Sequence, residues 1–139
     1  GSTDSLLGLY HLGSLTDDNR WRYFVQAQWD QPLAYRTQNH PGAEIDAALG
    51  AYYEGWALGP SAKVAPVLEF NATWRARDGG SEGDPENTGY TRLLVTPGLE
   101  FDVASLAIYL DVGLPVYMNA HANQLVSSRF WRLNLSHRF

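Results

Sequence analysis

Hydrophobic and polar residues alternate along most of this chain, and residues 106–118 show the pattern most clearly. One set of alternate positions there is wholly apolar, comprising Leu106, Ile108, Leu110, Val112, Leu114, Val116 and Met118. The intervening set is mixed and includes Asp111 and two tyrosines. Successive side chains of a β-strand point to opposite faces, so this period of two predicts a strand whose faces meet different surroundings.

Seven segments carry this alternation and are predicted strands: 5–15, 20–34, 43–57, 62–77, 89–103, 106–118 and 124–139. The first alternates poorly, because Leu6, Leu7 and Leu9 fall on both faces. Three prolines inside the segments each remove a ladder donor and predict bulges or strand ends: Pro66, Pro97 and Pro115.

The connections alternate in length. Those at 16–19, 58–61 and 104–105 are compact, whereas those at 36–42, 77–88 and 119–123 are longer or more polar. The polar stretch 77–88 is expected to be a flexible loop. Short turns at one rim and long loops at the other are typical of outer-membrane barrels. The chain is therefore expected to be all-β, a single domain over residues 1–139. It would form an antiparallel up-and-down transmembrane β-barrel of about eight strands, with short periplasmic turns and longer extracellular loops.

Seven strands conflict with the even number found in single-chain bacterial barrels. Three explanations are open. The first segment hides two short strands, a strand precedes the chain so that this is the C-terminal part of a larger barrel, or a second copy completes the closure.

The alternation also predicts two faces with distinct roles. In a membrane barrel the apolar face meets lipid or detergent and the polar face lines the lumen. Tryptophans near strand ends would then form an aromatic girdle, comprising Trp21, Trp29, Trp74, Trp131 and Phe139. Charges of both signs would pair in a lumen network made of Arg22, Asp30, Glu44, Asp46, Glu54, Lys63, Glu69, Arg75, Arg92, Glu100, Asp102, Asp111, Arg132 and Arg138. In the alternative, a soluble lipocalin-like barrel, the apolar face looks inward around a small apolar ligand.

The last segment looks like the closing strand of a bacterial outer-membrane barrel. Its apolar face ends on the final residue and comprises Trp131, Leu133, Leu135, His137 and Phe139. This face is the expected assembly signal for the barrel-assembly machinery, and the expected location is the outer membrane of a Gram-negative bacterium.

Composition narrows the classes of function. The 139 residues are 45% hydrophobic without an apolar run long enough for a transmembrane helix, which leaves a barrel open because its strands are apolar only at alternate positions. A net charge of −5 argues against nucleic-acid binding. With no cysteine, thiol chemistry and disulfides are absent.

No residue set predicts catalysis, a metal site or a cofactor. The histidines His11, His40, His121 and His137 lack metal-ligand spacing. Ser127 and Ser128 lie outside any nucleophile elbow, although a triad with His137 would give the third reading, an outer-membrane enzyme acting on lipid. The acidic loop residues lack an EF-hand pattern and are expected to be solvated; they are Asp78, Glu82, Asp84 and Glu86.

Three stretches carry a family resemblance: Thr96 to Phe101 (TPGLEF), Asp111 to Tyr117 (DVGLPVY), and Asn123 to Leu125 before a strand that ends in Arg138 and Phe139. They resemble the C-terminal end of the outer-membrane transporters grouped as the phenol-degradation meta-pathway family. The opening residues GSTD and LLG resemble a mid-chain strand of the same family. The resemblance implies a role related to transport of small hydrophobic molecules, in a porin-like barrel of which this chain is the C-terminal portion.

Overall fold

The computed structural model describes residues 2–35, 38–54, 56–121 and 127–138. These residues form eight β-strands and no helix: β1 (Ser2–Ser14), β2 (Trp21–Tyr35), β3 (Glu44–Tyr53), β4 (Trp56–Gly59), β5 (Ala62–Arg75), β6 (Tyr90–Val103), β7 (Leu106–Ala120) and β8 (Phe130–His137). All pairings are antiparallel, in the order β1-β2-β3-β5-β6-β7-β8, with β4 beside β5. The all-β antiparallel prediction is confirmed.

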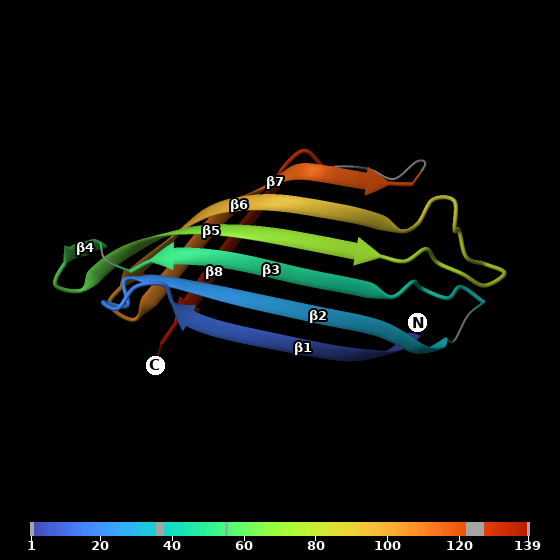
Figure 1. Ribbon diagram of the computed structural model, residues 1–139, viewed down its shortest axis with the longest axis horizontal. Coiled ribbons are helices and arrows are strands. Elements are labelled where there is room, and N and C mark those ends of the chain that lie inside the picture. The colour runs from blue at the N-terminus through green and yellow to red at the C-terminus, as the bar shows by residue number, and fades with distance from the viewer. Residues whose placement is uncertain (1, 36–37, 55, 122–126, 139) are drawn as a thin grey trace.

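The sheet curls into a half barrel, so that β8 passes behind the inner strands in Figure 1. The curl is evident from an ion pair between distant strands, in which Arg132 on β8 lies 3.3 Å from Glu69 on β5. Those strands are three places apart, which is about 14 Å across a flat sheet. β1 and β8 are the two free edges of the described sheet, so it is an open arc in which the expected closure is not seen.

The count of strands has a simple origin. β3 and β4 lie end to end along the same edge of β5, and together they correspond to the single strand expected at 43–57. The sheet is therefore seven strands wide, as the alternation predicted. β1 is one continuous strand of 13 residues, so the explanation that two short strands hide in the first segment is wrong.

Two bulges occur beside prolines. The register of β1 with β2 shifts where Asp4 faces Pro32, and that of β6 with β7 shifts where Leu94 faces Pro115. The second bulge places Met118 opposite Arg92 on the concave side, so its expected position on the apolar face is wrong. The bulges expected at Pro66 and Pro97 are also wrong, because both residues pair in regular register between β5 and β6.

The connections gather at opposite rims of the sheet. The compact turns 15–20, 60–61 and 104–105 lie at one rim, and the segments 38–43 and 76–89 lie at the other (Figure 1). In the first turn, the Thr16 hydroxyl donates a hydrogen bond of 2.6 Å to the Asp18 carboxylate and lowers the pKa of that carboxyl. β8 is shorter than the strand expected at 124–139. Residues 127–129 precede it outside any strand, and 124–126 and 139 lie outside the described residues.

Candidate functional site

The concave face of the half barrel holds a cavity of about 610 Å³ that is lined by both polar and apolar residues. Residues from every strand across the sheet's width line it, from Tyr10 on β1 to Arg132 on β8. Its polar lining includes Gln26, Gln28, Asp46, Asn71, Thr73, Arg92, Thr96 and Asp111. Carboxylates, guanidinium groups, amides and hydroxyls thus converge where a water-soluble protein would place its apolar core.

An ion cluster on this face includes two residues of the cavity lining, Asp111 and Arg132. The Arg132 Nη2 atom lies 2.6 Å from Asp111 Oδ2 and 3.3 Å from Glu69 Oε2, and Nε donates a further bond of 2.7 Å to Asp111. Only 3% of the Asp111 side chain and 8% of the Glu69 side chain are exposed, against 49% for Arg132. The guanidinium also lies 5.6 Å from the ring centre of Tyr109. One cation therefore neutralises part of the charge of two buried carboxylates.

Cross-strand register brings this cluster together. Arg132 faces Asp111 directly across β8 and β7, where side chains of paired residues are nearest neighbours. Glu69 comes from β5 and reaches the guanidinium only because the sheet is curled. The sequence predicted that these three residues share a face but not that they touch.

A second polar group lies towards the long-loop rim. Asp46 accepts a hydrogen bond of 2.7 Å from the hydroxyl of Thr73, which is also 3.4 Å from Arg92 Nη2. The Arg92 guanidinium lies 5.2 Å from the ring centre of Phe130 and 5.6 Å from that of Tyr90. Arg92 was expected to pair with a carboxylate, but the described part of the chain contains no ion pair of Arg92. Its guanidinium makes cation–π contacts with the two aromatic rings instead.

The remaining charged residues expected in the lumen network also lie on the concave side. Register places those in strands, and ion pairs with Arg22 and Asp102 place Glu54 and Arg138. Two pairs lie towards the short-turn rim, Arg22 with Glu54 at 3.6 Å and Arg138 with Asp102 at 3.2 Å. The others are paired across neighbouring strands. Asp30 faces Glu44, which in turn faces Arg75, while Lys63 faces Asp102 and Glu100 faces Ala65. The fourteen residues thus share one face but form several separate clusters.

The convex face carries the large apolar side chains. Exposed residues on it include Leu7, Leu9, Ile45, Leu49, Leu68, Phe70, Leu99, Leu110, Leu114, Leu133 and Leu135. Trp29 and Trp74 flank Ile45 in one cross-strand row towards the long-loop rim. Trp131 lies opposite Val112, near the middle of β7, and Phe139 lies outside the described residues.

An aromatic cluster at the short-turn rim extends the expected girdle. The ring centres of Trp21 and Tyr53 are 5.0 Å apart, and those of Tyr53 and Trp56 are 5.7 Å apart. Strict alternation from Tyr53 would place Trp56 on the polar face. One extra residue between β3 and β4, relative to β5, returns it to the apolar face. A single-residue bulge leaves no reliable mark in the sequence, although Glu54-Gly55 is a weak signal.

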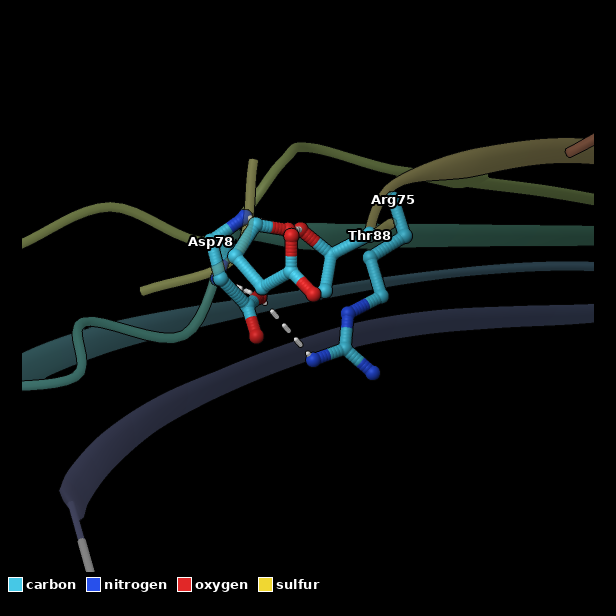
Figure 2. A network of polar contacts seen from close by, with 5 residues as sticks. Arg75, Asp78 and Thr88 are labelled. Carbon is cyan, nitrogen blue, oxygen red and sulfur yellow. Dashed lines mark hydrogen bonds and ion pairs between the residues drawn. The ribbon is translucent and has the colours of Figure 1, made fainter. Parts of the chain in front are cut away.

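Residues 77–88, expected to be flexible, are tied to the neighbouring loop through Asp78. The Asp78 carboxylate accepts hydrogen bonds from the Gly42 N–H at 2.9 Å and from Arg75 Nη2 at 3.2 Å. Its own N–H donates to the Thr88 hydroxyl at 2.9 Å, and Figure 2 shows Arg75 reaching towards this carboxylate. His40 and Gly79 add a backbone bridge between the loops. Asp78 was expected to be solvated, and that prediction is wrong, since the residue is buried.

The structure does not assemble a catalytic set from the residues considered for one. The Ser127 hydroxyl donates to the Arg129 carbonyl, whereas His137 contacts Ser105 at 2.9 Å. His11 contacts Tyr23, and His121 contacts the Gly89 carbonyl. The described residues contain no metal-binding group of three or more His, Asp or Glu. Nor do they include a helix that is both long and apolar enough to cross a membrane.

Comparisons with known proteins do not extend this picture. No family model, curated protein or solved structure matches the chain.

Proposed function

We propose that this chain is part of the wall of a bacterial outer-membrane β-barrel and serves as a channel- or transporter-related scaffold. Its convex face would contact lipid, and its concave face would line a polar, largely side-chain-filled lumen. Polar strand termini and aromatic rings at both rims are what such a barrel needs at the two membrane interfaces.

The proposal is supported by where polar and apolar side chains lie, which is the reverse of the distribution in a water-soluble protein. Among the described residues the buried polar and charged set comprises Glu69, Thr73, Asp78, Thr96 and Asp111, while the buried hydrophobic set is only Ala48 and Leu94. Large exposed apolar side chains cover most strands of the convex face. An apolar surface of that extent is unfavourable in water and favourable in lipid.

The same distribution weighs against the lipocalin-like alternative. A soluble barrel that holds an apolar ligand needs an apolar inner face. The lining of the concave cavity includes the amides of Gln26 and Gln28 and the charges of Asp46, Arg92 and Arg132. These groups favour water or polar solutes over an apolar ligand.

Two roles follow by extension from the proposal. The apolar face of β8, with Trp131, Leu133 and Leu135 exposed, is available to the barrel-assembly machinery as an assembly signal. The transport of small hydrophobic molecules, which the family resemblance implies, would need a path other than the polar cavity. Conductance in planar bilayers, with and without such solutes, tests that part of the proposal.

The experiment that tests the membrane orientation compares two adjacent positions on β2. By register, Ala27→Cys places a spin label on the convex face, in the row of Leu9 and Ala47. Gln28→Cys places one on the cavity side, beside Asp46. In proteoliposomes the label at residue 27 should collide with oxygen, which concentrates in the bilayer. The label at residue 28 should collide with a water-soluble nickel complex. Equal exposure of both labels to nickel, or a monodisperse protein without detergent, would reject the proposal.

A further inference from the structure

The convex face carries a small apolar pit towards the short-turn rim. The pit has a volume of about 290 Å³, and its lining includes Leu15, Tyr23, Leu49, Ala51, Leu68 and Phe70. Register explains it, because Ala51 lies in one cross-strand row between Tyr23 and Leu68, and its methyl group leaves space between those larger side chains. Leu49 and Phe70 face each other in the next row and bound the pit on the side of the sheet's middle.

Two polar side chains stand beside this pit, on the same face. His11 and Tyr23 occupy the convex positions of β1 and β2, in register with the row of Leu9. The Tyr23 hydroxyl lies 3.2 Å from His11 Nε2. A Cβ at Gly13 would lie 2.5 Å from a Tyr23 ring atom, so glycine there lets the ring lie over β1 and reach the imidazole. Neither side chain makes another hydrogen bond within the described residues.

The His11–Tyr23 pair keeps one hydrogen-bond donor free in either arrangement. If the Tyr23 hydroxyl donates to Nε2, the neutral imidazole carries its proton on Nδ1, and that N–H is free. If Nε2–H donates to the Tyr23 oxygen, the hydroxyl proton is free. Water is scarce beneath the headgroups of a bilayer, so an acceptor on a lipid molecule would gain a hydrogen bond there.

The pair lies at the depth where phospholipids carry their ester carbonyls. β2 has 15 residues. A strand needs only about 9–11 residues to cross the hydrocarbon layer, so about two or three residues of β2 extend beyond it at each end. Tyr23 is the third residue of β2 and therefore lies at the boundary between hydrocarbon and headgroups.

The turn beyond this boundary presents charges of both signs. Arg20 lies 3.5 Å from Asp18, and both side chains are more than half exposed. Asp17 adds a second exposed carboxylate. A guanidinium suits a phosphate, and carboxylates suit a primary ammonium, whereas the excess of acid disfavours a headgroup of net negative charge. These charges fit a zwitterionic headgroup better than an anionic one.

We propose that the pit, the His11–Tyr23 pair and the turn form a binding site for one phospholipid with an ethanolamine headgroup. One acyl chain fills the pit against Ala51, and an ester carbonyl accepts the free hydrogen of the pair. The phosphate lies beside Arg20 and the ammonium beside the two aspartates. This inference rests on the proposed function, because it requires the convex face to meet lipid.

The test uses the full chain in phosphatidylcholine vesicles that contain a trace of phosphatidylethanolamine with a photoactivatable diazirine in one acyl chain. After illumination, mass spectrometry of peptides locates the adducts. Adducts at residues 49–51 and 68–70 should exceed those at Leu110 and Leu114, which are convex residues of β7 outside the pit. Unlabelled phosphatidylethanolamine should lower the adducts in the pit more than phosphatidylglycerol with the same chains.

Two kinds of variant separate the pit from the polar pair. Ala51→Phe fills the pit and should abolish the excess of adducts. Its control is Ala47→Phe, which adds the same ring to the same face of β3 four residues away and should leave the excess unchanged. His11→Leu combined with Tyr23→Phe keeps the apolar lining but removes the donor, and should lower the adducts in the pit about fivefold. Circular dichroism checks that each variant retains the sheet, and the double variant decides the matter if Ala51→Phe does not.

Adducts spread evenly over the convex face would overturn the inference. So would equal competition by the two unlabelled lipids, equal adducts in the two phenylalanine variants, or no change in the double variant. The lipid exposure of residue 27 is measured separately, so contact of that residue with water would identify an error in the proposed function instead.

Discussion

Replacing Arg132 by methionine should destabilise the protein more than removal of any other described arginine. Methionine keeps the unbranched stem but leaves Asp111 and Glu69 buried without a cation. Removing one partner of a buried ion pair costs about 3–5 kcal/mol. Because half of the Arg132 side chain is exposed, solvent weakens the interaction, and we expect a loss at or below the low end, about 2–3 kcal/mol.

Equilibrium unfolding by urea in detergent micelles, followed by tryptophan fluorescence, measures this loss. With a slope of about 2 kcal/mol per molar urea, the midpoint should fall by about 1 M. The control is Arg138→Met, which removes an exposed pair with Asp102 and should cost less than about 1 kcal/mol. Adding Asp111→Asn and Glu69→Gln to Arg132→Met should restore most of the stability, because no buried charge then lacks a partner.

Equal losses for the two arginine variants would refute this reasoning. So would a triple variant no more stable than Arg132→Met alone, since the cost would then come from the lost contact of the guanidinium with the Tyr109 ring and not from uncompensated charge.

Three further predictions concern the sheet, a loop and a turn. Gly50→Ala should lower the free energy of unfolding by about 1–3 kcal/mol, and with it the urea midpoint, because a Cβ there would approach a ring atom of Phe24 to 2.3 Å. Asp78→Ala should speed tryptic cleavage after Arg77, because the loop loses its link to the neighbouring one. The carboxyl of Asp18 should titrate below its ordinary pKa of 3.8 in the folded protein, and Thr16→Val should raise that pKa, as NMR would show. Because the folded pKa is lowered, the turn's stabilisation is present above pH 3.8 and is lost as the pH falls through the folded value.

Each of these has a matched control. Gly59→Ala meets no atom within 4 Å of the new Cβ and should leave the midpoint unchanged. Glu82→Ala removes a nearby exposed charge and should not change cleavage after Arg77. Equal effects in variant and control, or an Asp18 titration that does not respond to Thr16→Val, would show that the assigned contacts are not responsible.

The candidate site was only partly predictable. Twelve of the fourteen charged residues assigned to one face lie in strands and on the concave side, since side-chain direction in a strand depends only on position. The other two, Glu54 and Arg138, lie outside the strands and pair with Arg22 and Asp102. Which of them touch was not predictable. Glu69 meets Arg132 through curvature, and Arg92 is held by aromatic rings from β6 and β8 instead of by an acid.

The sequence by itself determined the strands, the separation of apolar from polar faces and the seven-strand width of the sheet. These follow from a local rule, the period-two alternation of side chains. Tertiary structure decided the rest. One-residue bulges moved Trp56 and Met118 to the opposite face, and Asp78 became the link between two loops 36 residues apart. Bulges, curl and free edges arise from pairing between distant segments, and the energy of that pairing is not contained in any short stretch of sequence.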